Sequence, residues 1–270
     1  MRNRQNRTYA LVAVLVIAIV IGAFALSRSS SKPTSTTTTQ SSQQTGGEDK
    51  SEDLTKLAYH SGDDPVVTIN HNRSTLKADA WQNNHVIYSN LDDLNRTTAA
   101  NTAYLEARNV ANDSLRVRQY VQPSGWHQKM DQGQAIINRG HLIAYSLSGG
   151  IDQDGHYQPD NDSGDQNNPK NLFTQSAFSN QKLQTIYESK IRTALRQNKH
   201  VIFQAQAIFS GNNLMANGVH LQALSTDGQL NFNVYLHNVQ PGYQFDYATG
   251  RSKKDSSMRV PEPATSSRSW

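Results

Sequence analysis

The residues of this chain best suited to chemistry lie in two short stretches. The first is Arg139-Gly140-His141, at the end of a short apolar run, and the second is a predicted helix that carries Asn180 and Glu188. Asn180, Gln184 and Glu188 are successive i, i+4 steps, so their side chains should project toward one side of that helix. A histidine with an ordinary pKa of about 6.5 is largely neutral at pH 7 and can accept a proton from water. A histidine at the end of a strand can therefore face an amide and a carboxylate.

Several other kinds of catalytic site are missing from the sequence. The chain has no cysteine, which removes cysteine nucleophiles and thiolate zinc sites. It contains neither a Gly-x-Ser-x-Gly nucleophile elbow nor a Gly-x4-Gly-Lys-Ser/Thr phosphate loop. His127 and His156 lack ligand-like spacing to another histidine, so a zinc site is not expected.

The elements that would position these residues are predicted to form an α+β fold. The apolar positions from 176 to about 198 follow a helical period, and Asn198 stands where a helix would stop. Residues 91–105 also follow a helical period, with Asp92 or Asp93 as the cap. Strands are predicted at 65–70, 85–88, 134–138, 200–209, 219–225 and 230–236, the last two joined by a hairpin turn. This order predicts an antiparallel sheet with helices to one side.

The segment 149–170 is predicted to be a surface loop, because it is rich in Gly, Asp, Asn and Pro and has almost no apolar residue. It holds five aspartates, Asp152, Asp154, Asp160, Asp162 and Asp165. Their spacing does not match an EF-hand calcium loop, so a solvated acidic loop is expected.

The N-terminus is predicted to be a targeting segment. Arg2, Arg4 and Arg7 precede an apolar run over residues 9–26, which would span roughly 27 Å as a helix. That length is close to the hydrocarbon thickness of a bilayer, so residues 1–26 fit a signal-anchor. Ala23-Phe24-Ala25 also fits a cleavage site, so a cleaved signal peptide stays open. Either way, the positive-inside rule places the rest of the chain outside the cell, tethered or secreted.

The remainder divides into three predicted parts. Residues 27–56 are rich in Ser, Thr and Gln and are expected to be a disordered linker, because they cannot bury enough apolar surface to offset the entropy of ordering. Residues 57–250 are expected to form one folded domain. Residues 251–270 are expected to be a flexible tail. Nothing in the sequence indicates an oligomeric state.

The net charge of +4 does not by itself indicate nucleic-acid binding. Five of the 26 basic residues precede residue 33, where there is no acidic residue, so the rest of the chain carries 21 basic against 22 acidic residues. Any phosphate-binding surface must therefore be local. The stretch 96–139, with six arginines and lysines against three acids, is a candidate, although an ordinary solvated face would have the same composition.

Four motifs together resemble the DNA/RNA non-specific endonucleases with the ββα-metal (His-Me finger) fold, and among them the membrane-bound competence-type nucleases of Gram-positive bacteria. They are Asn138-Arg-Gly-His141, Asn168-Pro-Lys-Asn171, Ser179-Asn180-Gln181 and Tyr187-Glu-Ser-Lys-Ile-Arg192. The upstream segments 88–96 and 123–126 are also similar to the family. The resemblance covers about residues 85–250, and it implies a central antiparallel sheet flanked by helices.

The resemblance also implies roles for individual residues. His141 would be the general base, and Asn180 would be the one direct protein ligand of Mg²⁺, with waters completing the octahedron. Mn²⁺ would be able to substitute. Glu188 would hold one of those waters, and Asn171 would help to orient the site. Arg139 and Arg192 are each expected either to bind substrate phosphate or to form a structural ion pair.

One position departs from the family pattern. An aspartate usually precedes Arg-Gly-His, and this chain has Asn138 there. A carboxylate at this place would act on the metal or the histidine only indirectly. The replacement is therefore expected to change metal affinity or histidine pKa without abolishing catalysis.

The function that the resemblance implies is an extracellular, Mg²⁺-dependent endonuclease that cuts DNA and RNA without sequence preference and leaves 5′-phosphates. It would contact mainly the sugar-phosphate backbone. Two alternatives remain at this stage. One is a surface DNA-binding receptor for DNA uptake with weak or no cleavage, against which the near-neutral charge argues. The other is a phosphodiesterase or phosphatase with a small substrate.

Overall fold

The computed structural model describes residues 53–263. The predicted targeting segment, residues 1–26, and nearly all of the predicted linker lie outside the described residues. Among residues 53–263, no helix is both long enough and apolar enough to cross a bilayer. The last residues assigned to the linker, Leu54–Lys56, form a short 3-10 turn capped by the Asp53 carboxylate, so regular structure begins slightly earlier than residue 57.

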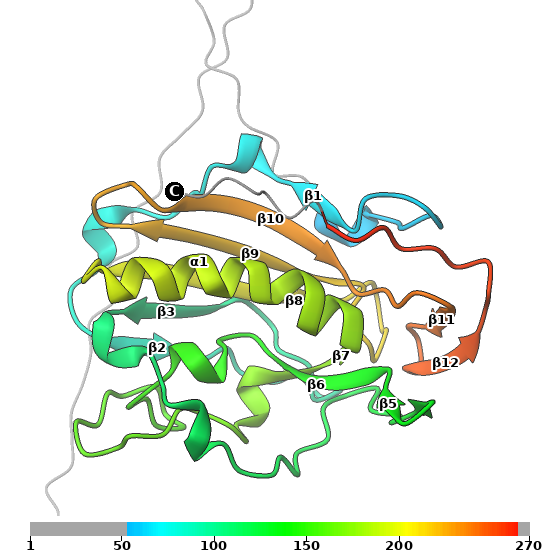
Figure 1. The fold of residues 1–270 in the computed structure, drawn as a ribbon, viewed down its shortest axis with the longest axis horizontal. Coiled ribbons are helices and arrows are strands. Elements are labelled where there is room, and N and C mark those ends of the chain that lie inside the picture. Colours follow the sequence, from blue (N-terminus) through cyan, green and yellow to red (C-terminus); the bar gives the residue numbers. More distant parts are fainter. Residues whose placement is uncertain (1–52, 264–270) are drawn as a thin grey trace, which may run out of the picture. The chain divides into compact units, whose positions relative to one another are not determined.

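A six-stranded antiparallel sheet forms the centre of the fold (Figure 1). Its order is β1-β10-β9-β8-β3-β2, and the pairs β2–β3, β8–β9 and β9–β10 join strands that are consecutive in the chain. The strands are β1 Val66–Thr68, β2 His85–Ile87, β3 Asn101–Leu105, β8 Val201–Ile208, β9 Gly218–Ser225 and β10 Asn231–His237. The predicted hairpin between β9 and β10 is confirmed, with Gly228 at φ 73° in its turn.

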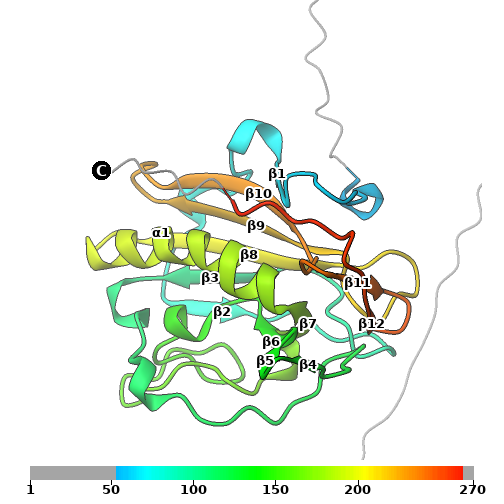
Figure 2. The same cartoon turned by 45° about the vertical axis from the view of Figure 1, so that its right-hand side comes forward.

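Two strands and a helix lie on one face of this sheet (Figure 2). Strand β6, Ile137–His141, pairs antiparallel with β7, Leu172–Ser176, and a helix follows β7 directly. That helix begins as a π-helical segment, η8 Ser179–Gln184, and continues as α1, Thr185–Arg196. It ends as predicted, since Asn198 takes the left-handed conformation (φ 58°) that terminates helices. The arrangement is therefore strand, strand, helix in chain order.

The remaining regular segments are short. Within residues 53–263, η8 and α1 together form the only helix longer than a single 3-10 turn. The 3-10 turns are η1 Leu54–Lys56, η2 Asn70–Asn72, η3 Ala78–Ala80, η4 Ala107–Asn109, η5 Asp113–Leu115, η6 Tyr145–Leu147 and η7 Pro169–Asn171. The small hairpin strands are β4 Met130–Asp131 with β5 Gln134–Ala135, and β11 Tyr243–Asp246 with β12 Arg251–Lys254.

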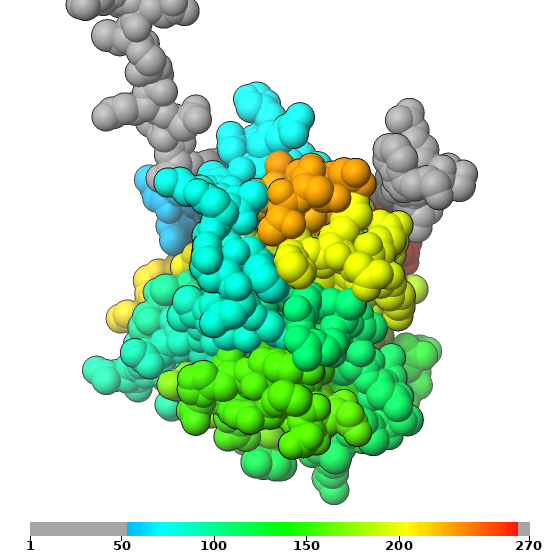
Figure 3. Space-filling view, turned by 90° about the vertical axis from the view of Figure 1, so that its left-hand side faces the viewer, coloured from blue at the N-terminus to red at the C-terminus, as the bar shows by residue number. Residues whose placement is uncertain are grey.

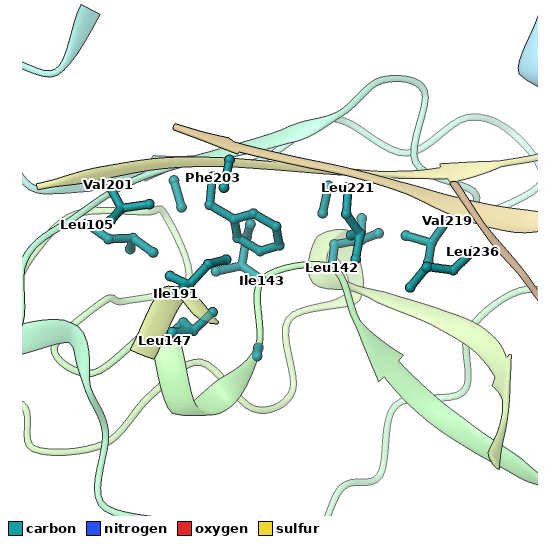
Figure 4. Close-up of a cluster of buried hydrophobic side chains, with 14 of the residues drawn as sticks. Leu105, Leu142, Ile143, Leu147, Ile191, Val201, Phe203, Val219, Leu221 and Leu236 are labelled. Carbon is teal, nitrogen blue, oxygen red and sulfur yellow. The ribbon is translucent and has the colours of Figure 1, made fainter. Parts of the chain in front are cut away.

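The hydrophobic core lies between the sheet and the strand-strand-helix unit (Figure 4). Leu142 and Ile143, the two residues after β6, are fully buried and point toward Phe203 and Leu221 of the sheet. Ile191 of α1 is buried in the same cluster. Burial of each such side chain contributes on the order of 1.5–3 kcal/mol. Burial of Leu142 and Ile143 in this core therefore anchors the end of β6, which carries His141.

The prediction of a helix over residues 91–105 is wrong. The Asp92 carboxylate accepts hydrogen bonds from the backbone N–H groups of Leu94 and Arg96, which closes a turn with Asn95 at φ 58°. The second half is β3, whose alternate residues Asn101, Ala103 and Leu105 are buried between β2 and β8. Small Ala and Thr residues fit a helical and an alternating pattern equally well, and sheet pairing decides between them.

The expected flexible tail does not begin at residue 251. Arg251–Lys254 form β12, which pairs in full register with β11. Beyond β12 the chain contacts the first part of the folded domain. Tyr59 Oη donates to the Arg259 carbonyl at 2.9 Å, and Ser61 Oγ donates to the Ser257 carbonyl at 2.6 Å. The neighbouring strand β11 and the distant residues Tyr59 and Ser61 supply the order that the composition of this segment does not suggest.

Candidate active site

A cavity of about 440 Å³ lies where β6 meets the start of the helix. Of the seven residues predicted for the site, five line it: Asn138, Arg139, His141, Asn180 and Glu188. Asn171 and Arg192 do not line this cavity. The register of β6 and the i, i+4 steps of the helix bring together residues from 39 to 50 positions apart in the sequence.

His141 is half-buried at the end of β6. Its Nε2 atom lies 3.3 Å from the Gln166 carbonyl oxygen and 3.3 Å from Gln119 Nε2. Burial lowers the pKa of His141 to about 4, while the Gln166 carbonyl opposes the shift and the nearby Arg116 charge adds to it. The imidazole is therefore neutral at pH 7 and has a nitrogen that can accept a proton.

Asn180 is held by two amide side chains. Asn138 Nδ2 donates to Asn180 Oδ1 at 3.2 Å, and Asn180 Nδ2 donates to Gln175 Oε1 at 3.0 Å. Gln175 lies opposite Asn138 in the β6–β7 pair and is fully buried. The Asn180 amide thus has its nitrogen turned toward β7 and its oxygen turned toward Asn138, which also lines the cavity.

The orientation of these amides is fixed from deeper in the protein. Gln184 Nε2 donates both to the His141 carbonyl at 2.7 Å and to Glu188 Oε1 at 2.9 Å. A carbonyl and a carboxylate only accept, so the amide nitrogen of Gln184 must point toward them. Its oxygen is then left to accept from Gln175 Nε2 at 3.0 Å. Gln175 in turn presents its oxygen to Asn180, so the direction of every bond in this amide chain follows from His141 and Glu188.

Glu188 is buried, and burial raises its pKa above the ordinary value, although Gln184 and the charges of Arg192 and Arg116 favour the carboxylate. Arg192 Nη1 lies 3.7 Å from Glu188 Oε2 and donates to Ser146 Oγ at 2.8 Å. Arg192 also donates to Ser189 Oγ at 2.5 Å. The Arg192 guanidinium therefore contacts Glu188, Ser146 and Ser189.

Arg139 faces the cavity. Its Nε donates to the Val121 carbonyl, and its guanidinium carbon lies 4.3 Å from the centre of the Trp126 ring. Burial and the nearby Arg118 charge both lower the pKa of Arg139, yet a guanidinium stays protonated at any physiological pH. Arg139 forms no ion pair among the described residues, so its charge is available to an anion in the cavity.

Asn171 lies behind the site and contacts the backbone that follows His141. Its Oδ1 accepts from the Ile143 N–H at 2.8 Å, and its Nδ2 donates to the Ile143 carbonyl at 2.9 Å. Its own carbonyl accepts from the Leu142 N–H at 2.9 Å. Asn171, the last residue of η7, therefore fixes the chain just after the histidine.

The sequence analysis places Gln184 on the same side of the helix as Asn180 and Glu188, at i, i+4 spacing, but gives it no role in the site. It misses Gln175, which continues the amide chain, and Gln119, whose Nε2 lies 3.3 Å from His141 Nε2. No local pattern identifies these two residues, because only the β6–β7 register and the path of the loop before β4 bring them to the site.

The residues present fit a single hard cation. Asn180 and Asn138 offer amide oxygens at the cavity wall, and the Glu188 carboxylate lies in the same cavity. Within residues 53–263, no three His, Asp or Glu side chains gather into a metal-binding cluster. A cation bound by one amide oxygen would keep most of its water, as Mg²⁺ does.

The fold and the site together define a ββα-metal nuclease: two antiparallel strands and a helix, with a histidine ending the first strand and an asparagine near the start of the helix. The model of the DNA/RNA non-specific endonuclease family matches residues 74–227. The chain belongs to this family.

Solved structures agree with that assignment. NucA from Streptococcus agalactiae with a magnesium ion bound is 32% identical, with a TM-score of 0.61 over 70% of this chain and 87% of that chain. The same nuclease with no metal bound gives a TM-score of 0.59 at the same identity and coverage. Sda1 nuclease with a bound zinc ion is 18% identical, with a TM-score of 0.52 over 69% of this chain and 95% of that chain, and shows the fold alone.

Proposed function

We propose that this protein is an extracellular, Mg²⁺-dependent endonuclease that hydrolyses DNA and RNA without sequence preference. The observation that carries the proposal is the placement of His141, Asn180 and Arg139 on the walls of one cavity. A proton acceptor, a metal-binding amide and a fixed positive charge are the three groups that phosphodiester hydrolysis needs.

His141 acts as the general base in this proposal. Neutral imidazole takes a proton from a water molecule, whose oxygen then attacks the phosphorus atom. The bond from phosphorus to the 3′ oxygen breaks, so the products are a 5′-phosphate and a 3′-hydroxyl that takes its proton from water. Arg139 neutralises charge on the phosphate oxygens, and its stacking on Trp126 holds the guanidinium in place.

Asn180 would hold the Mg²⁺ ion through Oδ1, and Glu188 would accept hydrogen bonds from the water bound to it. The bound cation would polarise the phosphate and stabilise the leaving oxygen. Support comes from the amide chain, which turns the Asn180 oxygen away from β7, and from NucA of Streptococcus agalactiae, a member of the same fold with magnesium bound. Mn²⁺ prefers similar oxygen ligands and is expected to substitute.

The proposed location outside the cell rests on the sequence of residues 1–26, which fits a signal-anchor or a cleaved signal peptide. The lack of cysteine means that the enzyme would depend on its core and not on disulfides outside the cell. Residues 57–250 are proposed as the nuclease domain, with β12 as its C-terminal extension.

The direct test is digestion of plasmid DNA and of a single-stranded RNA by the chain from residue 53 onward. We expect cleavage with Mg²⁺, none with EDTA, recovery when Mg²⁺ or Mn²⁺ is added back, and loss in His141→Ala. Equal cleavage by His141→Ala would refute the assignment of the base. Binding in EDTA without any cleavage in Mg²⁺ would favour the DNA-receptor alternative.

A further inference from the structure

A second concavity opens beside the active-site cavity. Its volume is about 480 Å³, and it shares two lining residues, Trp126 and Gln128, with the cavity that holds His141. Trp126 forms the boundary, because Arg139 stacks on its ring. The two concavities therefore adjoin at Trp126 and Gln128, next to the Arg139 guanidinium.

The far side of this concavity is built by β12, which lies beside the β4–β5 hairpin in both Figure 1 and Figure 2. Lys129 Nζ donates to the Ser252 carbonyl at 3.5 Å, and Lys254 Nζ lies 3.3 Å from Asp131 Oδ2. These contacts hold β12 against Lys129 and β4. The wall is thus a paired strand, not a free tail.

The charge of the second concavity is positive. Lys129 and Arg251 line it, and no acidic residue does. Arg251 and Lys253 are exposed at alternate positions of β12, and neither forms an ion pair among the described residues. Asp246, opposite Arg251, is engaged instead by Thr249 Oγ1 at 2.7 Å and the Ala248 N–H at 3.1 Å.

Another concavity next to the active site has no net charge. Its volume is about 730 Å³, it shares Gln181 with the active-site cavity, and its walls carry one acidic and one basic residue, Asp131 and Lys182. A concavity whose lining charges cancel attracts phosphate less than one lined by two basic side chains. Charge therefore favours the β12 side as the path of a polyanion that leaves the active site.

We infer that Trp126, Lys129, Arg251 and Lys253 form a β12 subsite that binds the phosphates next to the scissile phosphate of a nucleic-acid strand. This inference rests on the proposed nuclease function and deepens it by specifying the substrate class. A polynucleotide reaches both the active-site cavity and the β12 subsite. A small phosphodiester occupies only the active-site cavity, so Arg251 does not contribute to its binding.

The test is kinetics of the double variant Arg251→Glu/Lys253→Glu on a long single-stranded DNA and on bis(p-nitrophenyl) phosphate, both with Mg²⁺. The matched control is Arg73→Glu/Lys77→Glu, which makes the same change in charge with exposed residues near η3. The η3 segment is drawn in cyan, at the left of Figure 1 and facing the viewer in Figure 3, whereas β12 is at the right of Figure 1. The variant Arg251→Gln/Lys253→Gln removes the two charges without adding new ones, and it replaces the glutamate variant if that one does not fold. Thermal unfolding shows whether each variant is folded.

We expect KM for long DNA to rise about 10-fold or more in the β12 variant at low salt, with kcat within about 2-fold of wild type. The slope of log kcat/KM against the logarithm of salt concentration should become less negative by about 1 to 2. Turnover of the small diester and all values for the control should stay unchanged. An unaltered KM and salt slope would overturn the inference. Failure of the wild type to cut DNA at all would instead overturn the proposed function.

Discussion

The side chain of Gln175 lies directly against the backbone of Gly140. A Cβ atom at position 140 would stand 2.2 Å from Gln175 Oε1 and 2.7 Å from Gln175 Cβ. The first atom is the one that accepts the hydrogen bond from Asn180 Nδ2. The glycine between Arg139 and His141 is therefore needed for space, because only a residue without a side chain leaves room for the glutamine that holds Asn180.

Gly140→Ala is expected to displace Gln175 and to release Asn180, since the conflict includes Gln175 Cβ and cannot be relieved by rotating the end of the side chain. We expect the Mg²⁺ concentration for half-maximal activity to rise about 10- to 100-fold, as when other outer residues of a metal site are lost. Far-UV circular dichroism should show that the fold persists. Gly228→Ala, at an open hairpin turn, serves as the control and should leave the Mg²⁺ requirement unchanged.

The acid limb of the activity profile should lie well below pH 6.5. The base works only when neutral, so activity falls as the pH drops through the pKa of His141, which burial lowers to about 4. Gln119→Ala should uncover the ring, lessen the cost of protonating it and move the limb upward toward 6.5. A pH series of kcat/KM on both proteins measures this. A wild-type limb at 6.5 would contradict the proposed environment of His141.

Asn138→Asp should change the metal requirement more than it changes catalysis. A carboxylate cannot donate to Asn180 Oδ1 as the Asn138 amide does at 3.2 Å, and it adds a negative charge at the cavity wall. We therefore expect the Mg²⁺ concentration for half-maximal activity to fall about 10-fold. Asn138→Leu removes the donor without adding charge and separates the two effects. If neither kcat nor the Mg²⁺ requirement of Asn138→Asp changed, position 138 would have no influence on the site.

Gln184→Met should cost both stability and metal binding. It would leave the buried His141 carbonyl and Glu188 carboxylate without their shared donor, at a cost of about 1–3 kcal/mol in the free energy of unfolding. It would also remove the acceptor that orients Gln175, so the Mg²⁺ requirement should rise. Urea unfolding and a Mg²⁺ titration measure the two effects. Gln197→Met, at an exposed helix end, is the control, and equal behaviour of the two variants would show that the amide chain has no role.

How far the sequence predicts this molecule depends on the range of the contacts involved. The helix that carries Asn180 and Glu188 follows from a local period, and its stop at Asn198 follows from a local conformation. Residues 101–105 form a strand by pairing with the distant β8, and β12 forms by pairing with β11, so the composition of neither segment predicts its structure. The same limit applies inside the site, where spacing indicates that Asn180 and Glu188 lie together but does not reveal the buried Gln175 between them.

The amide chain has a consequence for how cation and substrate bind. It presents an oxygen to the cavity without bringing a negative charge there, and the one carboxylate in the cavity, Glu188, is already shared with Gln184 and Arg192. The free site should therefore hold a divalent cation weakly. The phosphate of the substrate supplies the missing charge, so the two ligands are expected to bind cooperatively, each raising the affinity of the other by the same factor. The enzyme would then be fully loaded with metal only when a nucleic acid is in place.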